Sequence, residues 1–116
     1  MSIYLIDKSG IYLMGQIAKE INTSQEIYMI KIGQSKNLRK RISQYKTVNP
    51  YCKCIDTIIS DNYNSLEKQY HKKIKSINGT QIDNTEWYIV SKTLFEKCLK
   101  YGFDIIDFYS IKQNNY

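Results

Sequence analysis

Apolar residues recur along the chain at two spacings, one typical of strands and the other typical of helices. Short apolar runs, rich in β-branched and aromatic residues, predict strands over residues 11–14, 27–32, 54–59 and 87–90. Longer segments, in which apolar residues recur every three or four positions, predict helices over residues 35–46, 65–77 and 91–102, with the caps included. We expect residues 16–26 to form a polar connection and residues 103–109 to form either a last strand or a docked tail.

Strands that come first, with helices interleaved later, are typical of the α+β class. We therefore expect a small, mainly antiparallel, three-stranded sheet flanked by helices. The 116 residues are enough for one modest core, so we expect a single domain over residues 1–116, with a C-terminal helix and tail over residues 91–116. Ser35 fits an N-cap for the first helix, and Asn64 fits one for the second.

The chain carries a formal net charge of +6, which makes nucleic acid a leading class of partner. Most of this charge comes from lysine, which an AT-rich genome would explain without any function. The two arginines of the chain, Arg39 and Arg41, lie two positions apart in the first predicted helix, and base composition does not explain that spacing. The stretch from Lys31 to Arg41 is therefore the most informative part of the sequence.

The cysteine content and the hydropathy of the chain indicate a compartment. Three cysteines in an otherwise cysteine-poor chain fit a reducing environment better than a disulfide framework. No apolar run approaches the roughly 18 residues that a membrane span needs, and the N-terminus lacks the basic and apolar regions of a secretory signal. We therefore expect a cytoplasmic protein with no membrane partner.

Several short motifs stand in a fixed order across the predicted strands and helices. They are Gly10-Ile11-Tyr12, Lys31-Ile32-Gly33, Asn37-Leu38-x-x-Arg41, Glu67, His71 and Glu86-Trp87-Tyr88. Over about residues 10–90, this order resembles the GIY-YIG nuclease superfamily. The closest resemblance is to a branch common in bacteriophages, large DNA viruses and some bacteria, in which lysine replaces the second tyrosine and an acidic-Trp-aromatic motif closes the domain.

The resemblance implies a DNA endonuclease that hydrolyses phosphodiester bonds with Mg²⁺ or Mn²⁺ as cofactor. It implies Tyr12 as the general base, Arg41 on the phosphate and Glu67 as the sole protein ligand of the metal ion. A free tyrosine has a pKa of about 10, so a tyrosine base needs a neighbour that lowers its pKa. Lys31 on the adjoining strand either supplies that positive charge or contacts the phosphate itself. His71, one helical turn beyond Glu67, joins the candidate catalytic residues.

Helix geometry separates the basic residues of the first predicted helix. Arg41 falls about 60° from Leu38 around the helix axis, at the margin of the buried stripe, whereas Lys40 points into solvent. Four further residues of this region are candidates for binding DNA, and they are Lys36, Arg39, Lys40 and Tyr45.

The chain also departs from the family pattern. The second tyrosine is absent, and the long gap between Tyr12 and Lys31 suggests an insertion over residues 16–26. No appended DNA-binding domain of the kind that homing and repair members carry is visible in the sequence. We therefore expect low sequence specificity, unless the insertion, a homodimer or a partner protein supplies it. The resemblance also favours a phage or viral origin, with action in the host cytoplasm or nucleoid.

Each candidate residue has an ordinary structural explanation as well. Tyr12 is one of eleven tyrosines and fits half-buried packing in a strand. Glu67 would occupy the N3 position of a capping box if Asn64 caps the helix. A lone histidine such as His71 is more often a packing or surface residue, and Glu86 fits a structural hydrogen-bond acceptor. The second function open to the chain is therefore a non-catalytic nucleic-acid-binding or protein-interaction module on a nuclease fold.

Overall fold

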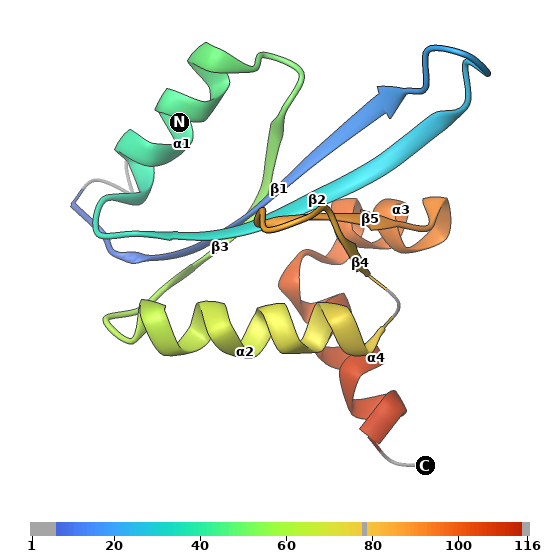
Figure 1. Cartoon of the computed structure of the whole chain (residues 1–116). Helices are drawn as coiled ribbons and strands as arrows, with labels where there is room; N and C mark the ends of the chain where they lie inside the picture. The colour runs from blue at the N-terminus through green and yellow to red at the C-terminus, as the bar shows by residue number, and fades with distance from the viewer. Residues whose placement is uncertain (1–6, 78, 115–116) are drawn as a thin grey trace.

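The fold, a computed structural model, is described for residues 7–77 and 79–114. Its elements follow in the order β1 (Gly10–Lys19), β2 (Glu26–Ser35), α1 (Leu38–Val48), β3 (Lys53–Ile59), α2 (Tyr63–Ser76), β4 (Thr80–Gln81), β5 (Trp87–Val90), α3 (Lys92–Tyr101) and α4 (Phe103–Asn114). The strands form one antiparallel sheet in the order β3-β1-β2-β5-β4, with α1 and α2 on opposite faces (Figure 1). Among the helices that the structure describes, none has the length and apolar character that a membrane crossing requires.

The expected α+β class is confirmed, but the prediction of a three-stranded sheet is wrong. β5 pairs with residues Tyr28 to Lys31 of β2, and β4 pairs with the other edge of β5, so the sheet has five strands. β4 is only two residues long, which is too short for a periodic pattern. The partner of β5 is a distant segment of the chain, and no local pattern identifies it.

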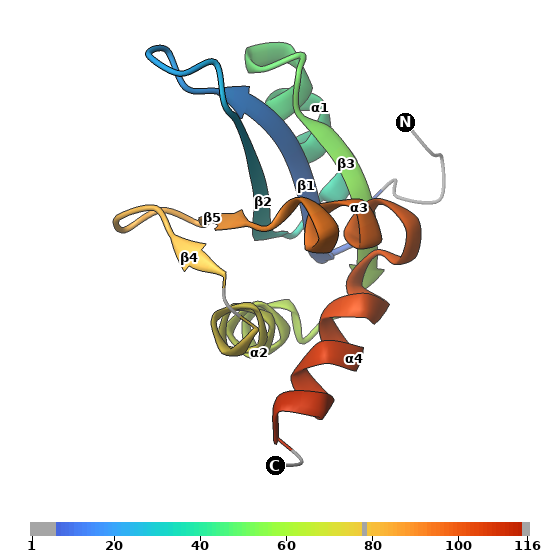
Figure 2. The same cartoon turned by 90° about the vertical axis from the view of Figure 1, so that its right-hand side faces the viewer.

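The segment expected to be a polar connection is mostly sheet. β1 continues to Lys19 and β2 begins at Glu26, and the two strands stay paired from Gly10 opposite Ser35 to Lys19 opposite Glu26. Most residues near the tip of this hairpin are partly or fully exposed, so no strict apolar alternation marks them as strand. Figure 2 shows the hairpin projecting beyond the part of the sheet that the helices cover.

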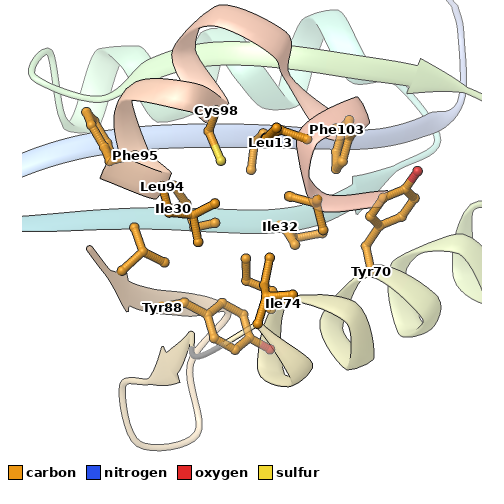
Figure 3. Packing of buried hydrophobic residues seen from close by; sticks show 14 of the residues in the cluster. Leu13, Ile30, Ile32, Tyr70, Ile74, Tyr88, Leu94, Phe95, Cys98 and Phe103 are labelled. Carbon is orange, nitrogen blue, oxygen red and sulfur yellow. The ribbon is translucent and has the colours of Figure 1, made fainter. Parts of the chain in front are cut away.

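The two faces of the sheet build two separate hydrophobic clusters, because successive side chains of a strand point to opposite faces. The larger cluster packs the sheet against α2, α3 and α4 and includes Ile11, Leu13, Ile30 and Ile32 (Figure 3). The smaller cluster lies between the sheet and α1 and contains Tyr12, Met14, Leu38, Ile42 and Cys52. β1 therefore contributes to both clusters, and Tyr12 faces α1.

α1 begins two residues later than the sequence suggested. Its N-cap is Asn37, whose side chain accepts a hydrogen bond from the Lys40 N–H at 3.2 Å. Ser35, the predicted cap, instead forms hydrogen bonds with the backbone of Asn37. Both residue types are good caps, and local sequence alone does not choose between two of them placed so close together.

Residues 103–109, expected to form a strand or a tail, belong to the helix α4. Gly102 ends α3 with a φ of 64°, a conformation that glycine adopts without strain. The Phe103 N–H then donates a hydrogen bond to Asp56 Oδ2 at 2.9 Å, so a carboxylate from β3 satisfies a free donor in the first turn of α4. The two residues lie 47 positions apart, which is why the local pattern did not reveal this helix start.

Replacing Asp56 with alanine is expected to lower the free energy of unfolding by about 0.5–2 kcal/mol, the usual effect of losing a helix cap. Asp61→Ala is the matched control, because Asp61 is exposed and its side chain makes only a 3.4 Å contact with the Ser9 hydroxyl. The control should change the free energy of unfolding by less than about 0.5 kcal/mol. Urea unfolding followed by circular dichroism measures both, and equal losses would contradict the capping role of Asp56.

Candidate active site

One face of the sheet carries Tyr12 and Lys31, the two strand residues expected in the site. β1 and β2 pair so that Tyr12 lies opposite Gly33 and Met14 lies opposite Lys31. Directly opposed residues point to the same face of a sheet, so Tyr12 and Lys31 share the face that α1 covers. Both residues are buried, with 2% of Tyr12 and 7% of Lys31 exposed.

The ring of Tyr12 lies directly over Gly33. A β-carbon placed on Gly33 would overlap the Cζ atom and the hydroxyl oxygen of Tyr12, so no larger residue fits there while the ring keeps its position. Gly33 does not end its strand, as β2 continues to Ser35. The glycine of the Lys31-Ile32-Gly33 motif therefore has a steric reason, which is to leave room for the Tyr12 ring.

The surroundings of Tyr12 raise its pKa, which is the opposite of the lowering expected from a neighbouring cation. Burial is the main cause, and Tyr45 and Glu86 add to it, whereas Arg41 acts in the other direction. The Tyr12 and Tyr45 rings lie 6.0 Å apart between centroids, so the two phenol groups are direct neighbours. Tyr12 is therefore a neutral phenol near pH 7 in the protein alone.

The ammonium group of Lys31 lies among aromatic rings rather than on Tyr12. Its Nζ atom is 4.6 Å from the centroid of the Tyr45 ring and 5.8 Å from that of the Trp87 ring. The positive charge of Lys31 also acts on Glu67, where it opposes an overall rise in the pKa of that carboxylate. No salt bridge to Lys31 is present within residues 7–77 and 79–114, so this buried cation has no carboxylate bound to it there.

α1 places Arg41 close enough to Tyr12 to lower its pKa. Arg41 is exposed and lines a surface hollow together with Gln44, Tyr45 and Val48. Arg39 lies two positions before Arg41, a separation of about 200° around the helix axis, so Arg39 projects from another side of α1. The two arginines of the chain therefore occupy different environments, and only Arg41 borders the site.

Glu67 does not have the capping role that the sequence suggested. The N-cap of α2 is Asn62, two positions before Asn64, and Glu67 lies beyond the first turn of the helix. Its side chain is half-buried, and burial is the main cause of a raised pKa, with a further contribution from the negative charge of Glu86. The positive charge of Lys31 opposes this rise. The carboxylate of Glu67 thus belongs to a group of charges and not to a helix terminus.

Glu67, His71 and Glu86 each bring one potential metal-ligating atom to within 4.8 Å of the others. Glu67 and His71 are four residues apart on α2 and so lie on one side of the helix. Glu86 comes directly before β5, whose first residue, Trp87, pairs with Lys31. Two carboxylates and one imidazole are a donor set that fits a divalent metal ion.

His71 connects α2 to the sheet. Its Nδ1 atom lies 2.6 Å from the Tyr88 hydroxyl, and the ring also lies near the backbone of Ile32. Burial is the main cause of a lowered pKa for His71, which the negative charge of Glu86 partly offsets. The imidazole is therefore neutral near pH 7, the state in which it binds a metal ion.

A family model, the T5orf172 domain, matches residues 3–101 of the chain. The chain belongs to the T5orf172 domain family. This family is phage-associated and related to nuclease-like folds. No curated protein and no solved structure matches the chain. The finer resemblance to the GIY-YIG superfamily stays a prediction.

Glu86 is the residue of this T5orf172 domain that the sequence reasoning set aside. It had been assigned a structural role, but it contributes to the group that contains Glu67 and His71. It also adds to the rise in the pKa of Tyr12. The acidic-Trp-aromatic motif, in which Glu86 comes directly before Trp87, was the one feature of the sequence that pointed to this residue. Nothing local indicates that β5 pairs with β2 and so brings Glu86 to the site.

The four residues expected to bind DNA fall into two groups in the T5orf172 domain. Lys36, Arg39 and Lys40 are exposed at the start of α1, where they are accessible to a partner. Tyr45 is half-buried and contacts both Tyr12 and Lys31, so it belongs to the candidate active site.

Proposed function

We propose that this T5orf172 domain is a metal-dependent endonuclease that hydrolyses phosphodiester bonds in DNA with low intrinsic sequence specificity. The observation that carries the proposal is that four side chains from β1, β2, α1 and α2 come near one another. They are Tyr12, Lys31, Arg41 and Glu67. Such a group offers a proton acceptor, two cations and a metal ligand, which are the parts that phosphodiester hydrolysis needs. The relation of the family to nuclease-like proteins and the net charge of +6 support a substrate that is DNA.

Lys31 and Arg41 would hold the phosphate. Lys31 is buried without a salt bridge among the described residues, and a buried cation is stabilised when an anion pairs with it. Arg41 is exposed at the border of the site, and its planar guanidinium matches two phosphate oxygens at once. Lys31 approaches the Tyr45 ring, which neighbours Tyr12, and Arg41 is near enough to Tyr12 to act on its pKa, so a phosphate held by both cations would lie near Tyr12.

Tyr12 would accept a proton from the attacking water. Its phenolate form is scarce in the protein alone, because burial, Tyr45 and Glu86 all raise its pKa. Glu67 would hold the metal ion, which supplies positive charge to the reacting phosphate when it is bound. Neutralising Glu86 also removes one of the interactions that keep Tyr12 protonated.

A non-catalytic DNA-binding module is the second candidate function, and the raised pKa of Tyr12 favours it, because a neutral phenol is a poor base. In that role, the exposed Lys36, Arg39 and Lys40 would bind DNA through its phosphates. Binding would weaken steeply as salt concentration rises and would survive Glu67→Ala, without cleavage and without metal dependence.

The two arginines provide a matched test of the nuclease proposal. Supercoiled plasmid incubated with the protein and Mn²⁺ or Mg²⁺ should become nicked or linear, and EDTA should prevent this. Arg41→Ala should reduce the cleavage rate by about 10²–10³-fold, because a charge that stabilises the reacting phosphate is lost. Arg39→Ala removes the same charge from the same helix and should keep the rate within about threefold of the wild type.

Two results of this experiment would contradict the nuclease proposal. One is a wild-type protein that leaves the plasmid supercoiled with either metal while still binding DNA, which is the result expected of the binding module. The other is an equal loss of cleavage in Arg41→Ala and Arg39→Ala, which would assign both arginines to general DNA attraction and not to the site.

A further inference from the structure

We infer that Glu67, His71 and Glu86 together form one three-ligand metal site that binds Mn²⁺ in preference to Mg²⁺. The inference deepens the metal dependence of the proposed function, in which the family resemblance implied Glu67 as the sole protein ligand. It concerns metal binding by the protein alone and is therefore tested without DNA and without cleavage.

The backbone fixes the three ligands relative to one another. Glu67 and His71 are one turn apart on α2, a helix of 14 residues, so their side chains leave the same side. Glu86 is held at the end of the sheet, because the Ile32 N–H donates a hydrogen bond to its carbonyl oxygen at 3.4 Å and the next residue, Trp87, pairs with β2. The potential ligand atoms lie within 4.8 Å of one another.

The charges around the three ligands favour a cation. Two carboxylates this close repel each other when both are ionised. Lys31 pairs with Trp87 across the sheet, and its Nζ lies over the rings of Tyr45 and Trp87 without a salt bridge to either carboxylate among the described residues. A divalent ion bound by both carboxylates would replace their repulsion with attraction to a shared positive charge.

The histidine makes the site selective. Mg²⁺ prefers an octahedral shell of oxygen atoms and gives up its waters reluctantly, whereas Mn²⁺ accepts an imidazole nitrogen more readily. The Nδ1 atom of His71 lies 2.6 Å from the hydroxyl of the buried Tyr88. A hydrogen bond of this kind is the usual support for a metal-bound histidine, because it fixes the orientation of the ring.

Titration of the protein with Mn²⁺ alone tests the inference, with the free ion followed by electron paramagnetic resonance and the heat of binding by calorimetry. Wild type should bind one Mn²⁺, and Mg²⁺ should compete with an affinity at least about tenfold weaker. His71→Ala and Glu86→Gln should each weaken Mn²⁺ binding by about tenfold or more, because a direct ligand is lost. Gln69→Ala, an exposed change on the same helix, should leave the affinity unchanged.

A purely structural role for His71, as a link from α2 to Tyr88 and to the Ile32 backbone, predicts a different result. His71→Ala would then lower the melting temperature without changing Mn²⁺ affinity in the folded protein. The same affinity for Mn²⁺ and Mg²⁺ in the wild type, or no saturable Mn²⁺ binding, would overturn the three-ligand site without any variant. Selective Mn²⁺ binding by a protein that does not cut DNA would support the metal site and reject the nuclease proposal. DNA cleavage by a protein that does not bind Mn²⁺ in the absence of DNA would support the nuclease proposal and reject the three-ligand site.

Discussion

Replacing Glu67 with glutamine is expected to reduce plasmid cleavage by about 10³-fold or more, since metal-ion stabilisation of a reacting phosphate contributes several kcal/mol. Glutamine keeps the size of the side chain but removes the negative charge that would bind the ion. Glu67 lies beyond the first turn of α2 and does not cap the helix, so the loss should come from the chemistry and not from the helix end. Cleavage with saturating Mn²⁺ measures the effect.

Glu96→Gln is the matched control for this substitution. Glu96 lies on α3 and is exposed, and its one ion pair, with Lys92 at 4.0 Å, is too long and too exposed to contribute much stability. Both substitutions raise the net charge by the same amount, so general attraction to DNA changes equally. If Glu96→Gln loses as much cleavage as Glu67→Gln, or if both keep the wild-type rate, Glu67 is not a ligand of a catalytic ion.

The residues of the site that local patterns could predict are those in the first two strands and the first helix. The apolar runs around Tyr12 and Lys31 marked two strands, and the helical stripe containing Leu38 and Ile42 marked α1. These elements are adjacent in sequence and pair with short connections, so their order also gave an approximate arrangement. The position of Arg41 at the margin of the buried stripe followed from helix geometry alone.

The parts that sequence reasoning missed depend on contacts between distant segments. Glu86 reaches the site because β5 pairs with β2, and α4 starts where it does because Asp56 of β3 caps it. Neither partner choice leaves a local signal. The surroundings of the Lys31 ammonium group were not predictable for a related reason. Strand pairing gives the face of a residue but not the path of a long side chain, which here reaches Tyr45 and Trp87.

Tyr12→Phe is expected to reduce cleavage by about 10²–10⁴-fold, the range that general acid–base catalysis usually contributes. Phenylalanine keeps the ring over Gly33 and removes only the hydroxyl, so the packing against α1 should survive. Tyr51→Phe is the matched control, because Tyr51 is 79% exposed and lies in no hydrophobic cluster of the described residues. Its cleavage rate should stay near that of the wild type.

The pH dependence of the wild-type rate then identifies what the Tyr12 hydroxyl does. The surroundings raise the pKa of Tyr12, so the phenolate fraction is small at neutral pH and increases with every step toward alkaline conditions. If Tyr12 is the base, the rate should rise by about tenfold per pH unit from about pH 6 to about pH 9, and Tyr12→Phe should abolish that slope. A neutral Tyr12 that only donates a hydrogen bond to the phosphate would instead give a rate that changes little over this range, and the slope of the Tyr12-dependent rate therefore separates proton abstraction from phosphate binding.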